Sequence, residues 1–286
     1  MKQIKYLVEF FLISILFFIF RIIGYRNASA LGEKIGITFG PFFRNNKIIL
    51  NNLIESKIGS NDSEREKIIK TMWGNYGRIL AEYPYIKDFR NSKLKKYISV
   101  SGKDILENLK MNNKKVLFVS GHFNNFELMA LQIEKSGIDL AAIYRPLNNI
   151  FLNKTMENIR KKYICKNQVK KGKSGTRKII EHINNGNSVA IMIDQRVSEG
   201  KKCNFFGRKA FTTTIPAQLI KKYEIEVVPV YIERKEGIFF NIIFNKPILF
   251  DNKKSVEEIT EDLNIVLEKM ILNNPSQWIW SHNRWK

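Results

Sequence analysis

His122 and Glu127 are two residues whose types and spacing could carry out acid–base chemistry. An imidazole takes up and releases a proton near neutral pH, and a nearby carboxylate can hold the ring and stabilise its positive form. Four residues separate the two, which gives a compact His-x4-Glu pattern. The spacing alone is a weak motif, because a loop histidine followed by an ordinary acidic helix residue gives the same pattern.

The segment around this pair is predicted to form a strand, a turn and a helix. Residues 116–119 form an unbroken apolar run with two valines, which is typical of a buried strand. Asn124 or Asn125 can cap the helix that follows. His122 would then lie in the turn at the carboxyl end of a strand, where open α/β sheets bind their ligands. Glu127 would lie in the first helical turn, where the positive helix end favours a carboxylate.

Two further predicted strands end in charged residues. Arg145 follows residues 139–144, and Asp194 follows residues 188–193. The carboxyl ends of parallel strands meet at one edge of a sheet, so His122, Arg145 and Asp194 should lie close together. Arg145 would offer a fixed cation to an anionic or carbonyl oxygen, and Asp194 a buried carboxylate that orients the arginine or the histidine. Taken singly, a surface arginine and a turn-forming aspartate explain each residue as well.

The chemistry that these groups favour is direct base catalysis. Ser120 precedes His122 too closely for an obvious catalytic triad, and the chain has no nucleophile elbow. We therefore expect His122 to remove a proton from an acceptor hydroxyl while Glu127 holds the imidazole. Cys165 and Cys203 lack the paired spacing of a metal motif or disulfide framework, and three histidines are too few for a histidine-rich metal site.

The N-terminal segment is strongly hydrophobic. Residues 6–23 are apolar apart from one serine and two charged residues. Three interpretations fit this segment: a signal peptide with a small-residue cleavage site at residues 28–30, a helix that spans a bilayer, and a helix that lies in the lipid interface. We favour a retained anchor, spanning or half-inserted, because residues 31–36 continue the helical periodicity into the rest of the chain.

The remainder of the chain predicts an α/β fold. Residues 44–58 and 62–86 should form helices, the second capped by Ser63 with Glu66 as its partner. From about Tyr97 onward strands and helices alternate, which favours a mixed, largely parallel sheet flanked by helices, preceded by the N-terminal hydrophobic membrane-anchor helix. Residues 201–214 are expected to form a loop.

The charge balance predicts an anionic partner. The 286 residues include 48 Lys and Arg against 27 Asp and Glu, a formal net charge of +21. Such a balance suits nucleic acid, anionic lipid or an acidic carrier protein. Basic loops, such as residues 170–175 and 201–202, are ordinary solvated surface when considered singly. Together with the anchor, they favour a membrane-facing surface or a docking site for an acidic protein.

The motif at His122 and Glu127, together with several others along the chain, resembles those of a known family. His-x4-Glu after a buried strand is the hallmark of the glycerolipid acyltransferase superfamily. Further motifs narrow the resemblance to the lipid A biosynthesis acyltransferases of the lauroyl/myristoyl type. These motifs are Asn75-Tyr76-Gly77-Arg78 with Glu82-Tyr83, Tyr144-Arg145-Pro146, Met192-Ile193-Asp194-Gln195, Phe205-Phe206-Gly207-Arg208 followed by residues 212–216, and the ending Pro275-x-Gln277-Trp278-x-Trp280-x-His282-x-Arg284-Trp285. The chain departs from the pattern at Arg196, where many members carry an acidic residue.

The resemblance implies transfer of a fatty acyl chain from acyl carrier protein to a hydroxyl of a lipid A precursor. It implies a place at the cytoplasmic face of the inner membrane of a Gram-negative cell, with an anchor helix over residues 1–26 and an acyltransferase domain over 27–286. No cofactor or metal is implied. The expected catalytic residues are His122 and Glu127, and the expected substrate-binding residues are Arg145, Asp194, Gln195 and Arg208. The expected partners are acyl carrier protein, the lipid A precursor and anionic inner-membrane lipid, with no nucleic acid.

Two alternatives remain at this level. Within the same class, the acceptor could be another phospholipid or glycolipid. In another class, the chain could be a membrane-tethered nucleic-acid-binding protein whose affinity falls steeply with salt. This second alternative leaves His122 and Glu127 without a role, and the sequence contains no recognised nucleic-acid-binding motif.

Overall fold

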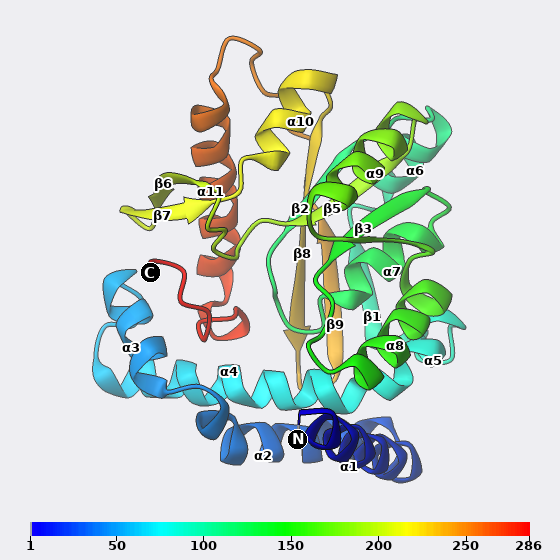
Figure 1. Ribbon diagram of the computed structural model, residues 1–286, viewed down its shortest axis with the longest axis vertical. Coiled ribbons are helices and arrows are strands. Elements are labelled where there is room, and N and C mark those ends of the chain that lie inside the picture. The colour runs from blue at the N-terminus through cyan, green and yellow to red at the C-terminus, as the bar shows by residue number, and fades with distance from the viewer. Residues whose placement is uncertain (1) are drawn as a thin grey trace.

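A seven-stranded sheet forms the centre of the molecule, and helices cover both of its faces (Figure 1). The computed structural model describes residues 2–286, apart from the side chain of Lys173. The strand order is β1-β9-β8-β2-β5-β3-β4, and every neighbouring pair is parallel except β8 and β9. The predicted fold class is therefore confirmed: the sheet is mixed and largely parallel, and an apolar helix precedes it.

The strands of the sheet are β1 (Ile98–Ser101), β2 (Leu117–Ser120), β3 (Leu140–Tyr144), β4 (Asn167–Lys170), β5 (Ser188–Met192), β8 (Val227–Lys235) and β9 (Phe239–Phe244), and a separate hairpin consists of β6 (Lys201–Phe205) and β7 (Arg208–Thr212). The helices are α1 (Lys2–Ile23), α2 (Tyr25–Phe43), α3 (Asn46–Glu55), α4 (Asp62–Glu82), α5 (Ile86–Arg90), α6 (Lys103–Met111), α7 (Glu127–Lys135), α8 (Ile150–Ile159), α9 (Lys173–Asn184), α10 (Ile215–Tyr223) and α11 (Val256–Asn273).

The central strand β2 sets the position of the turn that carries His122. All four of its residues are buried, because β5 and β8 pair with its two edges and helices cover its faces. This burial explains its continuous apolar sequence. The chain crosses from β2 to β3 through α7 and returns from β4 to β5 through α9. The carboxyl ends of β2, β5 and β3 thus lie side by side at one edge of the sheet.

Helices α1, α2 and α4 form a layer along the lower edge of the molecule in Figure 1. Helix α2 packs on α4 through small residues that let the two backbones approach closely. A Cβ on Gly36 would stand 2.1 Å from the Trp73 carbonyl oxygen, and one on Gly77 would stand 1.9 Å from the Gly32 carbonyl oxygen. Gly77 of the Asn-Tyr-Gly-Arg motif is thus explained by helix packing.

Three local predictions were wrong. The predicted loop 201–214 contains the hairpin β6–β7, whose strands pair in antiparallel register from Lys201 with Thr212 to Phe205 with Arg208. Helix α4 is capped by Asn61, whose side chain accepts a hydrogen bond from the Glu64 backbone N–H, rather than by Ser63.

The cap predicted for α7 is also different. The residue before this helix is Phe126, and no side chain caps its first turn. Asn124 and Asn125 donate to Gln277 and Glu82 instead, so these amides tie the turn to other parts of the molecule.

Candidate active site

His122 lies in the turn after β2. A buried carboxylate, Asp194, follows the neighbouring strand β5 and holds the imidazole in place. The Oδ1 atom of Asp194 lies 2.8 Å from the imidazole Nδ1. The other oxygen, Oδ2, accepts hydrogen bonds from the His122 backbone N–H at 2.7 Å and from the Trp278 indole N–H at 2.9 Å. Because a carboxylate accepts the Nδ1 proton, the second ring nitrogen, Nε2, keeps its lone pair and can act as a base.

The charges of this pair support each other. Burial acts to lower the pKa of His122, but the charge and hydrogen bond of Asp194 outweigh it and raise this pKa above its ordinary value. Burial acts to raise the pKa of Asp194, whose side chain is fully buried. The charge of His122, with the hydrogen bonds from the imidazole, the His122 backbone N–H and Trp278, holds that pKa below its usual range. Asp194 is therefore a fixed negative charge behind the imidazole.

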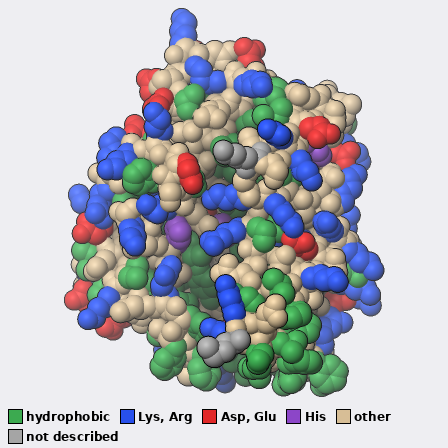
Figure 2. Space-filling model, in the orientation of Figure 1, with side chains coloured by type: hydrophobic (Ala, Val, Ile, Leu, Met, Phe, Trp, Pro, Cys, Tyr) green, Lys and Arg blue, Asp and Glu red, His purple; other side chains and the backbone are tan. Residues whose placement is uncertain are grey.

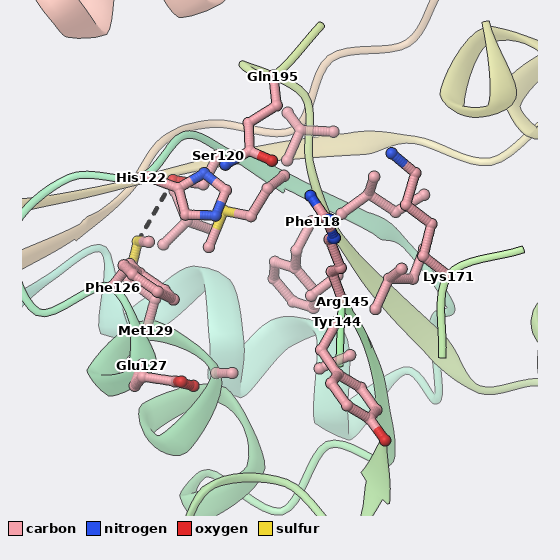
Figure 3. A pocket seen from close by; sticks show the side chains of 18 of the residues that line it. Phe118, Ser120, His122, Phe126, Glu127, Met129, Tyr144, Arg145, Lys171 and Gln195 are labelled. Carbon is pink, nitrogen blue, oxygen red and sulfur yellow. Dashed lines mark hydrogen bonds between the residues drawn. The ribbon is translucent and has the colours of Figure 1, made fainter. Parts of the chain in front are cut away.

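The structure places Glu127 near the imidazole but pairs it with a different residue. Glu127 lies in the first turn of α7, and its Oε1 atom accepts from Arg160 Nε at 2.7 Å and lies 2.6 Å from Nη2. Figure 3 shows this carboxylate directed away from the His122 ring. The hydrogen bond expected from Glu127 to His122 is thus supplied by Asp194. A catalytic role for Glu127 stays a prediction, supported by its place in the pocket wall and by its charge, which also raises the His122 pKa.

A pocket of about 330 Å³ opens in front of the imidazole, among the carboxyl ends of β2, β3 and β5. Its walls are mainly apolar. The apolar lining includes Phe118, Met129, Ile133, Ala142, Ala190 and Val230. His122 and Glu127 line the same pocket, and this combination of an apolar space with a few converging polar groups is typical of a site for a hydrophobic ligand.

Cations stand at one side of this pocket. Figure 3 shows Arg145, which follows β3, and Lys171, which follows β4, side by side across the pocket from His122. Within the part of the chain that the structure describes, neither side chain forms an ion pair. Gln195 adds an amide on the His122 side. On the face shown in Figure 2, lysine and arginine side chains surround a hollow with hydrophobic walls. Such a site can receive an apolar chain that carries an anionic or polar head.

The expected site residues do not all meet there. His122, Glu127, Arg145 and Gln195 line the pocket, and Asp194 lies directly behind the imidazole. Arg208, at the start of β7, is half-exposed, lies 3.1 Å from the Glu55 carboxylate and does not line the pocket. Its substrate-binding role stays a prediction that no contact in the pocket supports. The described residues contain no group of three or more His, Cys, Asp or Glu side chains that could hold a metal ion.

A buried ion pair lies behind the turn that carries His122 and Glu127. The carboxylate of Glu82 in α4 is fully buried and lies 2.5 Å and 3.0 Å from the two Nη atoms of Arg234 in β8. It also accepts a hydrogen bond from Asn125 at 3.1 Å and one from Ser29 of α2 at 2.7 Å. Because Asn125 lies between His122 and Glu127, this network fixes the turn relative to the N-terminal helices.

The C-terminal segment completes the support. Arg196, at the position that departs from the family pattern, donates its backbone N–H to His282 Nε2 at 2.9 Å and its Nε–H to the Lys286 carbonyl at 2.8 Å. Burial lowers the pKa of His282 to about 4, so this imidazole is neutral and can accept that bond at physiological pH. Arg284 is fully buried and donates to the Thr212 hydroxyl at 2.7 Å. The C-terminal motif thus fixes the segment that follows Asp194.

The whole chain is similar to one known protein family. The family model described as bacterial lipid A biosynthesis acyltransferase matches residues 1–286. The chain belongs to this family. Among curated relatives, the Escherichia coli K12 lipid A biosynthesis palmitoleoyltransferase is 25% identical over 262 residues, which are 90% of this chain and 84% of the relative. The lauroyltransferase of the same organism is 24% identical over 272 residues, 92% and 85% of the two chains. The Shigella flexneri lipid A biosynthesis acyltransferase 2 is 23% identical over 229 residues, 77% and 70%.

Three residues of the candidate site were not predicted from the sequence. Arg160 pairs with Glu127, Lys171 stands at the pocket, and Trp278 holds Asp194. Arg160 and Lys171 belong to basic segments whose spacing gives no sign of which cation turns inward. Trp278 lies in the quoted C-terminal motif, and its buried indole N–H required a nearby acceptor, so this signal was present.

Proposed function

We propose that this protein transfers a fatty acyl chain from an acyl carrier protein thioester to a hydroxyl of a lipid A precursor, at the cytoplasmic face of the inner membrane. Family membership supports the reaction class and the acceptor class. The observation that carries the proposal is an imidazole, held by a buried carboxylate, on the wall of an apolar pocket with cations beside it.

The chemical steps follow from the state of His122. With its Nδ1–H donated to Asp194, the ring takes the hydroxyl proton of the acceptor on Nε2. The acceptor oxygen attacks the thioester carbonyl and forms a tetrahedral intermediate. Collapse of this intermediate breaks the carbon–sulfur bond, and the imidazolium gives its proton to the leaving thiolate, which departs as the thiol of the carrier protein. Asp194 stabilises the imidazolium between these two transfers.

The other pocket residues have roles that follow from their charge and position. The apolar walls hold the acyl chain. Arg145 and Lys171 bind an anionic group of the acceptor or stabilise the oxyanion, because both are free to turn towards negative charge at the pocket. Glu127 keeps Arg160 in the wall and adds negative charge that favours the imidazolium. The net charge of +21 favours docking of an acidic carrier protein and of anionic lipid.

The experiment is a transfer assay with the full chain in vesicles. Acyl carrier protein thioester and a lipid A precursor are supplied, and mass spectrometry follows the acylated product. We expect transfer by the native chain, and a loss of about 10²–10⁴-fold in His122→Ala because the general base is removed. His182→Gln is the matched control, since this histidine lies in α9 outside the pocket.

Each result has a distinct meaning. Normal transfer by His122→Ala contradicts the assignment of the base. Transfer to an ordinary phospholipid, with none to the lipid A precursor, contradicts the acceptor while leaving the acyl-transfer chemistry in place. No consumption of the thioester with either acceptor contradicts acyl carrier protein as the donor.

A further inference from the structure

Helix α1 is long and apolar enough to cross a membrane. The most apolar 18 residues of this 22-residue helix have a mean hydropathy of 2.3. Its length of about 33 Å at 1.5 Å per residue matches a hydrocarbon core of about 30 Å. Length and composition therefore fit both a spanning helix and one that lies in the lipid interface. The contacts that α1 makes with the rest of the protein distinguish the two.

One face of α1 is attached to the domain along almost the whole helix. Near its start, the Asn149 side chain donates to the Tyr6 carbonyl at 2.8 Å and to the Glu9 carboxylate at 3.0 Å. Further along, the Phe10 ring packs near Phe151 of α8, with centroids 6.1 Å apart. Glu9, the acidic residue within the apolar segment, thus has a polar contact with the domain, although its side chain stays 41% exposed and lies 3.9 Å from Lys5.

The far end of α1 is held by polar contacts as well. Phe20 is fully buried, and its carbonyl accepts a hydrogen bond from the Tyr85 hydroxyl at 2.5 Å. Arg21 donates to the carboxylate of Asp88, and its guanidinium lies 4.7 Å from the centre of the Tyr85 ring. From Tyr6 to Arg21 the attached length is about 22 Å. A helix that crossed the bilayer would have to break these contacts or carry Asp88 and its neighbours into the hydrocarbon, which is costly for charged groups.

The opposite face of α1 is an exposed apolar stripe. It consists of Ile4, Leu7, Val8, Phe11, Leu12, Ile15, Phe18, Ile19 and Ile22, each at least 40% exposed. This spacing places the side chains along one side of a helix from end to end. The lower edge of the molecule in Figure 2, over α1 and α2, is accordingly a broad hydrophobic surface. Soluble proteins rarely leave so many large apolar side chains uncovered.

The elements next to α1 indicate that a lipid surface covers its apolar stripe. Helix α2, at the same edge in Figure 1, ends in Phe42 and Phe43, which are 84% and 85% exposed and extend the apolar surface beyond α1. Lys5 and Arg26 are exposed cations on the two helices, placed as in helices that lie among anionic headgroups. An apolar stripe with cations beside it suits a lipid monolayer.

We propose that α1 does not cross the bilayer but lies flat in the lipid interface, with its inner face on the domain and its apolar stripe among the acyl chains of one monolayer. Asn149, which holds the start of α1, follows the pocket residue Arg145 by only four positions. The membrane surface would therefore lie next to the pocket.

The test is a depth measurement with a nitroxide label at single introduced cysteines. Variants Ile4→Cys, Phe11→Cys, Ile15→Cys and Ile22→Cys place the label along the stripe, with the full chain bound to phosphatidylethanolamine–phosphatidylglycerol vesicles. The native thiols are buried, and burial raises the pKa of Cys165 to about 12, so the label reacts at the introduced site. Relaxation by oxygen and by a polar nickel complex then gives the depth at each position.

We expect all four labels at a similar shallow depth in one monolayer. Lys253→Cys, an exposed site in the loop between β9 and α11 at the opposite end of the molecule in Figure 1, is the control and should remain in water. If positions 11 and 15 lie near the bilayer centre while positions 4 and 22 lie near opposite headgroups, the helix spans and the proposal is overturned. Labels that stay out of lipid and are covered by a second copy of the chain would overturn it as well.

Discussion

Two carboxylates flank the candidate base, and they are held in opposite ways. Asp194 comes from the turn after β5, 72 residues beyond His122 in the chain, is fully buried and bonds directly to the imidazole. Glu127 comes from the adjacent helix, only five residues after His122, and forms its ion pair with Arg160. The carboxylate that is near in sequence is thus the one without a bond to the ring.

The two carboxylates are suited to different roles. Asp194 accepts three hydrogen bonds, from the His122 imidazole, the His122 backbone N–H and the Trp278 indole N–H. Its charge is thus held beside the ring, where it can set the tautomer and stabilise the imidazolium. Glu127 shares its charge with Arg160 and acts on the imidazole only through space. Glu127 lies at a fixed short spacing from His122, so the His-x4-Glu pattern suggests that these two residues are partners. Asp194 lies in a separate motif, and the pairing of β2 with β5 is what brings it to the imidazole.

The largest effect is expected from Asp194→Asn. An amide carries no negative charge to stabilise the imidazolium. It can also turn its N–H towards Nδ1, which favours the tautomer with the proton on Nε2 and removes the base. Transfer should therefore fall by about 10²–10⁴-fold. The measurement is product formation per enzyme in vesicles, with thermal unfolding to confirm that the variant is folded. Activity within a few-fold of the native chain would show that Asp194 does not orient the base.

A smaller loss is expected from Glu127→Gln. The substitution removes the charge of Glu127, and the hydrogen bonds between the charged Glu127 and Arg160 contribute about 1.5–3 kcal/mol. If all of this energy is lost from the transition state, transfer should fall by about 10–100-fold. The double variant Glu127→Gln/Arg160→Met should transfer no less than the single variant, since the unpaired arginine is then gone. The same transfer assay measures both proteins. A loss in Glu127→Gln greater than in Asp194→Asn would reverse the comparison between the two carboxylates.

The smallest effect is expected from Trp278→Phe. This change removes one hydrogen bond to Asp194 Oδ2 but leaves the two from His122 in place. We expect a loss of stability of about 1–3 kcal/mol, from the lost bond to a buried carboxylate, and a loss of transfer of about tenfold or less. Denaturant titration and the transfer assay measure these quantities. No change in either would show that the indole N–H does not hold Asp194.

Much of this arrangement followed from the sequence, for physical reasons. The apolar run of β2 and the strand ends at Arg145 and Asp194 fixed the edge of the sheet where the site lies, since parallel strands align their carboxyl ends. The partner of each charged group did not follow. Glu127 has His122 nearby in sequence and Arg160 nearby in space, and only the packing of α7 against the segment after α8 decides between them.

The elements that sequence reasoning misplaced depend on contacts distant in the chain. The hairpin β6–β7 carries lysines and arginines on its exposed side, so its alternation is hidden in a basic segment; α11 and the C-terminal segment give it a surface to pack on. Asn124 and Asn125 have the composition of helix caps, yet their amides bind Gln277 and Glu82, partners that no local pattern indicates.

The pH dependence of kcat/KM for acyl transfer, measured for the native chain, Asp194→Asn and Glu127→Gln, tests whether Asp194 raises the pKa of His122 more than Glu127 does. The base acts when neutral, so transfer should rise as the pH passes through the raised pKa of His122. Without the negative charge of Asp194 this pKa falls, and the acidic limb of the profile should move to lower pH, by more than in Glu127→Gln. An acidic limb that stays in place in Asp194→Asn, or that moves further in Glu127→Gln, would show that Asp194 is not the main charge that stabilises the imidazolium.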